Sequence, residues 1–313
     1  MLKRLNSIGL GSRIIAATIV LMLVVVAVNY AVFVKSYKGD ALQAMVDRAS
    51  SFSALADETK EHVGSLAKQG TFDMDAMMAE LAEARAADPD YDYTQSRIFG
   101  TIPVVAGWTA AENAAEKEGL SFRITAFEAR NPKNEPTAEG EPFRYQMLTD
   151  LTEQVKSGGD ISMNRVNSET NTLHYMRAIT LTDDCMMCHG QPGGPNDPDG
   201  DGQDILGFAM EGWEPGKMHG SYELMMPLGT MDASVANFVA TGAMWTAPLL
   251  IGGALIFALL MRRMFSKPMA NLIHRVRDIA EGEGDLTQRI DSGSKDELGV
   301  LSGWFDKFIE RIQ

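Results

Sequence analysis

Two stretches of the chain carry no charged side chain and consist mostly of apolar residues. The first covers residues 14–34, and the second covers residues 240–261, directly before Arg262. About 20 apolar residues in a helix cross the hydrocarbon core of a membrane. A cleaved signal peptide is the alternative for the first stretch, but its apolar core is long for one and no clear small-x-small cleavage site follows. The pattern predicts two transmembrane helices.

Basic side chains flank these two helices at their outer ends. Because basic residues stay on the cytoplasmic side, residues 1–13 and 262–313 are expected in the cytoplasm and residues 35–236 outside it. A two-pass protein of the bacterial inner membrane with a periplasmic domain is therefore predicted. The residues that decide the orientation are Lys3, Arg4 and Arg13 before the first helix, and Arg262, Arg263 and Lys267 after the second.

The segment between the two helices mixes two kinds of apolar spacing. Some stretches place apolar residues at helical intervals, and others come close to the strict alternation of half-buried strands. Short strands and helices in one domain indicate the α+β class. The predicted helices cover residues 40–68, 76–86 and 106–118, and the predicted strands cover residues 121–129, 173–181 and 222–226.

The segment after the second apolar helix predicts two amphipathic helices joined by a connector. Their apolar residues recur at steps of three and four, which is the spacing of a coiled-coil seam. The connector carries two isolated apolar residues, Leu286 and Ile290. The seam positions are Met269, Leu272, Val276 and Ile279 in the first helix, and Leu298, Leu301, Phe305, Phe308 and Ile312 in the second.

The formal net charge of the chain is −14, and the excess acid lies in residues 35–236. Residues 262–313 carry basic and acidic side chains in balance. An acidic outer domain argues against nucleic acid and against anionic lipid as its partners. The same acidity is also what solubility alone would produce.

The only two cysteines of the chain, Cys185 and Cys188, stand in the sequence DDCMMCHG and are followed at once by His189. A disulfide across this spacing closes a very small loop and adds little stability. A zinc site needs more ligands, and a thioredoxin-type site usually has Pro or Gly between its cysteines. Cys-x-x-Cys-His is the attachment signature of c-type haem. We therefore expect one covalent haem, with both cysteines as thioethers and His189 as the proximal iron ligand.

Several short pieces around this motif occur in a characteristic order. They are IPVV at residues 102–105, RNPKNEP at 130–136, EGW at 211–213 and HG at 219–220. Together with the haem motif they resemble the c-haem PAS-like periplasmic sensor domains of bacterial chemoreceptors and sensor kinases, over about residues 40–232. The resemblance implies an antiparallel sheet with flanking helices, with the haem in its pocket.

The residue on the other side of the iron is less well specified. The resemblance favours Met74, Met77 or Met78 as the distal ligand, whereas Met176, His174 and His62 are further candidates. With 20 methionines in the chain, any one of them is equally well explained as core filler. Arg130 and Arg177 are candidate partners of a haem propionate, because a guanidinium matches carboxylate geometry. Both could equally be structural, and for His219 the structural role is favoured over a place in the haem pocket.

An acidic loop follows the haem motif, with Asp197, Asp199 and Asp201 at alternate positions. This spacing matches the first half of a calcium-binding loop. Asp204 and Phe208 stand where an EF-hand has an apolar residue and its last glutamate, which argues against that motif. A Ca²⁺ ion at the three aspartates is one interpretation, and a solvated acidic insertion is the other.

The C-terminal segment resembles a HAMP domain over about residues 263–313. Two short sequences carry this resemblance, Gly284-Asp285-Leu286-Thr287 and Asp296-Glu297-Leu298-Gly299. A HAMP domain is a parallel four-helix bundle in a homodimer, and it relays small helix movements from the membrane. The resemblance therefore implies a homodimer that acts on a cytoplasmic signalling domain or protein outside this sequence. A generic juxtamembrane coiled coil is the alternative.

These features predict a transmembrane sensor whose haem responds to redox state or to a diatomic gas. No catalytic constellation is visible in the sequence, so an enzyme is not expected. A membrane-tethered monohaem cytochrome for electron transfer is the main alternative. A haem peroxidase is a third interpretation, in which His174 or His62 would supply acid–base chemistry.

Replacing Phe305 by Asp distinguishes the sensor from the electron carrier. The substitution puts a charge into the predicted seam of the signalling helices. A sensor loses its output while its haem absorbance is unchanged, whereas an electron carrier works as before. Receptor output and haem content, measured on the same variant, check this prediction.

Overall fold

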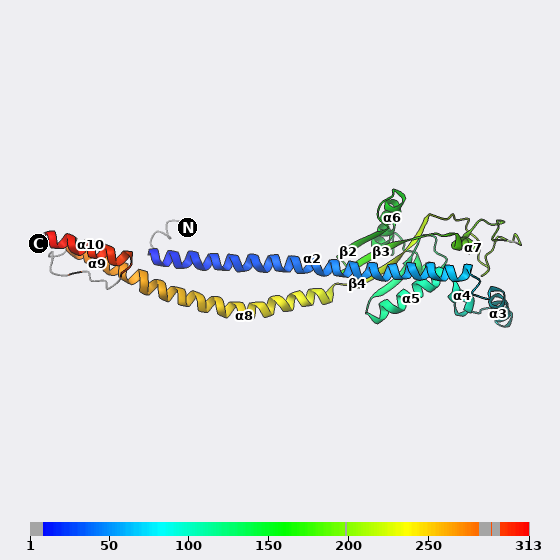
Figure 1. Cartoon of the computed structure of the whole chain (residues 1–313), viewed down its shortest axis with the longest axis horizontal. Coiled ribbons are helices and arrows are strands. Elements are labelled where there is room, and N and C mark those ends of the chain that lie inside the picture. Colours follow the sequence, from blue (N-terminus) through cyan, green and yellow to red (C-terminus); the bar gives the residue numbers. More distant parts are fainter. Residues whose placement is uncertain (1–8, 198, 282–288, 290–294, 313) are drawn as a thin grey trace. The chain divides into compact units, whose positions relative to one another are not determined.

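The computed structural model describes residues 9–197, 199–281, 289 and 295–312 (Figure 1). The chain forms two compact units. One unit is Lys38–Ala233, and the other combines Met1–Tyr37 with Ser234–Gln313. The first contains the predicted sensor domain, and the second contains both apolar stretches and the C-terminal helices.

Both apolar stretches form helices that are long and apolar enough to cross a membrane, as predicted. The first lies within α2 (Leu10–Lys68) and the second within α8 (Gly229–Met261). The helix of the first apolar stretch and the helix predicted over residues 40–68 are one element, because α2 continues without a break into the sensor unit. Pro is absent from the sequence there, and the single Gly39 is not enough to end a helix.

Within the second unit, aromatic side chains join the two apolar helices. The ring of Phe238 stacks on Phe33 at 4.1 Å between centroids. The hydroxyl of Tyr30 lies 3.3 Å from that of Thr246. Gly242 faces Tyr30 so closely that a β-carbon there would lie 2.4 Å from the Tyr30 hydroxyl oxygen. A small residue is therefore needed at this crossing.

The two predicted amphipathic helices after α8 are confirmed. A π-helical turn, η4 (Arg262–Ser266), leads into α9 (Lys267–Glu281), and α10 (Glu297–Ile312) follows. Asp296 begins α10, because its carboxylate accepts hydrogen bonds from the backbone of Leu298 and Gly299. Part of the predicted connector lies outside the described residues, including Leu286, Ile290 and the sequence GDLT at 284–287.

The sensor unit is built on a four-stranded antiparallel sheet, as the α+β prediction required. The strand order is β1-β4-β3-β2. The sequence did not predict β2, because this edge strand, SMNRVN, is mostly polar. The strands are β1 (Ser121–Thr125), β2 (Ser162–Asn167), β3 (Thr172–Thr180) and β4 (Met218–Pro227).

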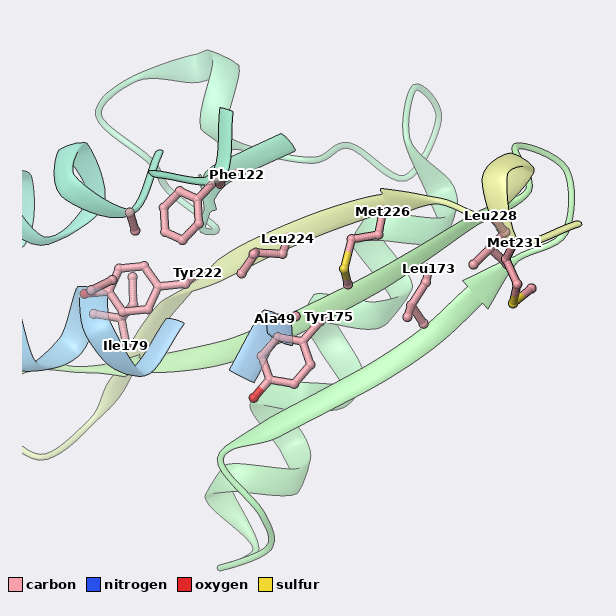
Figure 2. Close-up of a cluster of buried hydrophobic side chains, with 13 residues drawn as sticks. Ala49, Phe122, Leu173, Tyr175, Ile179, Tyr222, Leu224, Met226, Leu228 and Met231 are labelled. Atoms are coloured by element: carbon pink, nitrogen blue, oxygen red, sulfur yellow. The ribbon is translucent and has the colours of Figure 1, made fainter. Parts of the chain in front are cut away.

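Helices cover both faces of this sheet. Alternation along β3 sends Leu173 and Tyr175 toward α2 and α5 (Pro103–Lys117) and sends Met176 toward α6 (Pro142–Lys156). Figure 2 shows the larger core, in which Tyr222, Leu224 and Met226 follow one another along β4. α6 was not predicted, because its charged and polar residues hide a short apolar stripe of Met147, Leu148 and Leu151.

Small residues let α5 approach α2 closely. A β-carbon on Gly107 would lie 2.4 Å from the carbonyl oxygen of Ala56. Ala49, Ser53 and Ala56 recur along the buried face of α2 at helical intervals, and all three are fully buried. This packing fixes α2 against the sheet and makes it one wall of the space above β1 and β3.

A smaller layer of short elements closes the far end of the sensor unit. Its core contains Met77, Leu81, Ile98 and Leu206. The elements are α3 (Met74–Ala87), η1 (Tyr93–Gln95), α4 (Arg97–Thr101), η2 (Pro132–Asn134), η3 (Asp183–Cys185) and α7 (Met186–His189). The haem motif occupies the last two of these, directly after β3.

A buried ionic network joins the sheet to α6. Glu223 is fully buried and accepts hydrogen bonds from Arg144 at 2.8 Å and from Thr125 at 2.6 Å. The Nδ1 atom of His174 lies 2.8 Å from its other oxygen. Burial alone would raise the pKa of Glu223, but these hydrogen bonds and the charge of Arg144 lower it to about 2.

We predict that Glu223→Gln destabilises the sensor unit by about 1.5–3 kcal/mol, because the buried Arg144 loses its charged partner on the sheet and keeps only the more exposed Glu141. The exposed pair of Arg48 and Glu118 supplies the control, and Glu118→Gln should cost less than about 1 kcal/mol. Urea unfolding of the full chain in detergent, followed by tryptophan fluorescence, gives both values. Equal costs for the two variants would contradict the prediction.

The same network gives a stability that depends on pH. Since the pKa of Glu223 falls from 4.5 to about 2 on folding, its contribution of roughly 3 kcal/mol is present above pH 4.5. It is lost as the pH falls from 4.5 toward 2, where the folded carboxylate becomes protonated. The Gln variant should lack this dependence.

Candidate functional site

The haem motif is held in a tight turn after β3. The Thr182 carbonyl accepts from the Cys185 backbone at 3.0 Å, and the Thr182 backbone N–H lies 3.4 Å from the Cys185 sulfur. Gly190 ends α7, and a β-carbon there would lie 2.5 Å from the Met186 carbonyl oxygen. The turn therefore places Cys185, Cys188 and His189 within one short arc of backbone.

All three motif side chains line a cavity of about 610 Å³ between the sheet, α2 and α5. This volume lies within the range of roughly 300–1,000 Å³ that is usual for cofactor sites. Much of the wall is apolar, including Val105, Trp108, Ile124, Ile179, Leu206 and Phe208. Three cationic residues, Lys60, Lys68 and Arg130, also contribute to it.

This combination fits the haem that the sequence predicts. Two thiols and an imidazole share the cavity with apolar walls that suit a flat macrocycle, while the three cations at the wall are paired with acidic side chains of the protein. Burial, followed by the charge of Asp204, raises the pKa of the Cys188 thiol to about 12. Such a thiol is not a thiolate at neutral pH, which disfavours Cys188 as a nucleophile in disulfide exchange.

Glu211 and Trp213 fix the ring of His189. Its Nδ1 atom lies 2.8 Å from a carboxylate oxygen of Glu211. The Trp213 ring stacks on it at 4.2 Å between centroids, with the planes only 10° apart. Burial and the charge of Arg130 lower the pKa of His189, against the opposing effect of Glu211. The lowered pKa favours the neutral imidazole over the imidazolium.

Arg130 donates hydrogen bonds to several groups of the protein itself. Its guanidinium contacts both oxygens of Glu211, at 2.7 and 3.0 Å, and donates to the Cys188 carbonyl at 2.9 Å. A further bond goes to the buried carboxylate of Asp204. Arg130 also lines the cavity, and its predicted contact with a haem propionate stays a prediction.

Arg177 lies on β3 beside α2 and does not line the cavity. Its Nε atom is 3.6 Å from a carboxylate oxygen of Asp57 and makes no hydrogen bond. The hydroxyl of Tyr222, its cross-strand neighbour, is likewise buried without a hydrogen-bond partner. A propionate contact for Arg177 therefore stays a prediction as well.

The structure places none of the predicted distal ligands on the described wall of the cavity. Met74, Met77 and Met78 belong to the small core with Leu206, which does reach the cavity. Met176 is buried under α6, His174 is bonded to Glu223, and His62 is exposed on α2. Among the described lining residues, the only methionine is Met187 of the haem motif itself.

Four residues of the site had no site role predicted from the sequence, namely Asp204, Glu211, Trp213 and His219. Asp204, Glu211 and Trp213 support His189. The sequence EGW at 211–213 had contributed only to the family resemblance. His219 was expected to be structural, but it lines the cavity and lies 3.5 Å from Trp213 between ring centroids. Burial, followed by the nearby His189, lowers the pKa of His219 to about 4.

The acidic loop brings its three aspartates together. The carboxylate oxygens of Asp197, Asp199 and Asp201 lie within 4.8 Å of one another. Asp197 is buried and already accepts from the backbone N–H groups of Gly193, Gly200 and Gly202. Because these bonds explain the position of Asp197 without an ion, Ca²⁺ binding stays a prediction.

The haem motif also touches α2 directly. Asp184 pairs with Lys68 at 3.1 Å, and a β-carbon on Gly64 would lie 2.8 Å from the same carboxylate group. Lys60, Glu61, Ser65 and Lys68 form the α2 side of the cavity. Any rearrangement at the motif therefore meets the helix that contains the first apolar stretch.

Two family models match the chain. The model described as Tll0287-like matches residues 38–227, and the HAMP domain model matches residues 260–313. The second match confirms the HAMP prediction. A crystal structure titled as the cyanobacterial heme-protein Tll0287 is 15% identical and covers 59% of this chain and 95% of that one, with a TM-score of 0.36.

Curated relatives are methyl-accepting chemotaxis proteins of Pseudomonas. TlpQ of Pseudomonas aeruginosa is 45% identical over 65 residues, which are 20% of this chain and 9% of TlpQ. PctB of the same species is 37% identical over 92 residues, 29% of this chain and 13% of PctB. McpG of Pseudomonas putida is 47% identical over 53 residues, 17% and 8% of the two chains. The chain thus spans only a small part of each relative's length.

Proposed function

This chain belongs to the Tll0287-like family and carries a HAMP domain, and on that premise we propose that it is the input part of a transmembrane receptor that senses through a c-type haem. One observation carries the proposal. The three side chains of the attachment motif share a cavity whose wall includes α2, the helix that continues into the first apolar stretch. The chemoreceptor relatives support a role in signalling rather than in catalysis.

Each motif residue has a defined task in holding the haem. Cys185 and Cys188 would hold the haem through two thioether bonds to its vinyl groups. His189 offers its Nε2 lone pair as the proximal ligand. The bound iron supplies the chemistry of the signal, a change of oxidation state or the binding of a diatomic gas.

The signal leaves the cavity through α2 and β4. Lys60, Ser65 and Lys68 face the cavity from α2, and β4 leads directly toward α8. A change in the preferred position of either segment is transmitted only if haem state and helix position are energetically coupled. The contact of Asp184 with Gly64 and Lys68 joins the haem motif directly to α2 and is our candidate for this coupling.

The HAMP helices point to a homodimer. Several apolar side chains of α9 and α10 are largely exposed in the single chain, among them Ile273, Leu301, Trp304 and Phe308. Packing against a second copy in a parallel four-helix bundle would bury them. The dimer would pass the signal to a cytoplasmic output domain or protein, as in the chemoreceptor relatives.

The flanking basic residues support the orientation. We propose a two-pass protein of the inner membrane, with residues 35–236 in the periplasm and residues 262–313 in the cytoplasm. Attachment of c-type haem outside the cytoplasm is consistent with that topology. A tethered electron carrier remains the alternative, but a carrier has no use for the HAMP domain.

The covalent haem is tested by double replacement of Cys185 and Cys188 with Ser in the full chain, produced with haem-maturation machinery. Wild type should keep its haem after denaturation and acid–acetone extraction, and the double variant should lose it. Met187→Leu lies inside the same motif and should behave as wild type. A wild-type chain without covalent haem would overturn the proposal.

Absorption spectra of the loaded chain then separate the two kinds of stimulus. A haem that is six-coordinate in both oxidation states and inert to carbon monoxide and nitric oxide indicates redox sensing or electron transfer. A five-coordinate ferrous haem, or one that yields its distal ligand to gas, indicates a gas sensor. In the second case, replacement of Met74, Met77 and Met78 one at a time identifies any methionine ligand.

A further inference from the structure

We infer that Glu211 is the positioning residue for the proximal ligand His189, and that Arg130 and Asp204 hold it in place. Asp204, Arg130, Glu211 and His189 form a continuous chain of charged hydrogen bonds from the acidic loop to the imidazole. The role rests on the proposed haem at His189, but the geometry of the chain does not depend on it.

Glu211 and Trp213 fix the orientation of the His189 ring. Glu211 binds its Nδ1 edge at 2.8 Å, and Trp213 covers one face at 4.2 Å. The backbone is fixed as well, because the Trp213 N–H donates to the His189 carbonyl at 2.8 Å. Rotation of the ring would break the Glu211 contact and the stack together.

The contact with Glu211 also determines which ring nitrogen of His189 carries the proton. Glu211 forms an ion pair with Arg130, whose guanidinium donates to both of its oxygens, as expected for an ionised carboxylate. An ionised carboxylate can only accept hydrogen bonds. The proton of the neutral imidazole therefore sits on Nδ1, and Nε2 keeps the lone pair that a metal needs. A carboxylate partner also makes the imidazole a stronger donor to the metal.

Arg130 and Asp204 in turn hold Glu211 in place. Arg130 binds both of its oxygens and also the Cys188 carbonyl, so that one guanidinium holds the carboxylate and the backbone of the motif. Asp204 anchors Arg130 and accepts from the backbone of Leu206 and Phe208 at 2.8 and 2.9 Å. The acidic loop thus has a structural task at the iron ligand.

The test is Glu211→Gln in the full, haem-loaded chain. The variant keeps the shape of the side chain but removes its charge, so His189 becomes a weaker donor. We expect the reduction potential to shift to a more positive value and the ferrous iron–imidazole stretching band in resonance Raman spectra to shift to lower frequency. Glu211→Asp should restore part of both shifts.

Glu214→Gln is the matched control. Glu214 is three residues away, is exposed and pairs with Lys217, so its loss removes the same charge without touching His189. Its potential and Raman band should equal those of wild type. The inference is overturned if Glu211→Gln and Glu214→Gln give the same values in both measurements.

Two further measurements test the inference if Glu211→Gln folds poorly or if the chain carries no haem. If Glu211→Gln does not fold, Asp204→Asn decides, with a smaller shift in the same direction expected and an unchanged potential counting against the inference. If wild type carries no haem, the proposed function fails by itself. The ¹⁵N chemical shifts of His189 in the haem-free chain then report whether Nδ1 holds the proton, and a proton on Nε2 overturns the inference.

Discussion

The guanidinium of Arg130 is the single group on which the arrangement of the site depends. It joins Glu211, Asp204 and the Cys188 carbonyl, which belong to parts of the chain that are otherwise irregular. Burial alone would lower the pKa of Arg130, but Glu211 and Asp204 raise it, so the charge is retained. Charged hydrogen bonds of this kind are stronger than neutral ones. They give definite geometry to a segment that has neither a long helix nor a strand.

The sheet supplies the rigid base for that segment. β3 runs under α2 and then delivers the chain directly into η3 and α7, so the cysteines begin where the sheet's backbone hydrogen bonds end. α2 is held against the same sheet by small residues such as Ala56, opposite Gly107. α2 therefore belongs both to the cavity wall and to the first apolar stretch.

Two ionic networks, one buried and one partly buried, stabilise the sensor unit on different elements. Arg144, Glu223 and His174 tie α6 to the sheet. Arg130, Glu211 and Asp204 organise the haem motif. Each network leaves few bonding atoms unsatisfied, which is the condition under which buried charges are tolerated. In the described part of the chain, the exceptions are the unpaired Nε of Arg177 and the hydroxyl of Tyr222, both beside α2.

Periodicity and local motifs were enough to predict the two apolar helices, the amphipathic pair at the C-terminus, the α+β class and the haem motif, because each depends on residues close together in the sequence. The polar edge strand β2 and the helix α6 gave no comparable pattern. The support of His189 was also beyond the sequence alone. Arg130, Asp204 and Glu211 are as far as 81 residues apart, and only folding brings their charges into contact. The motif by itself predicts which atoms would bind a haem, whereas the tertiary structure decided how the imidazole is oriented and which helix adjoins it.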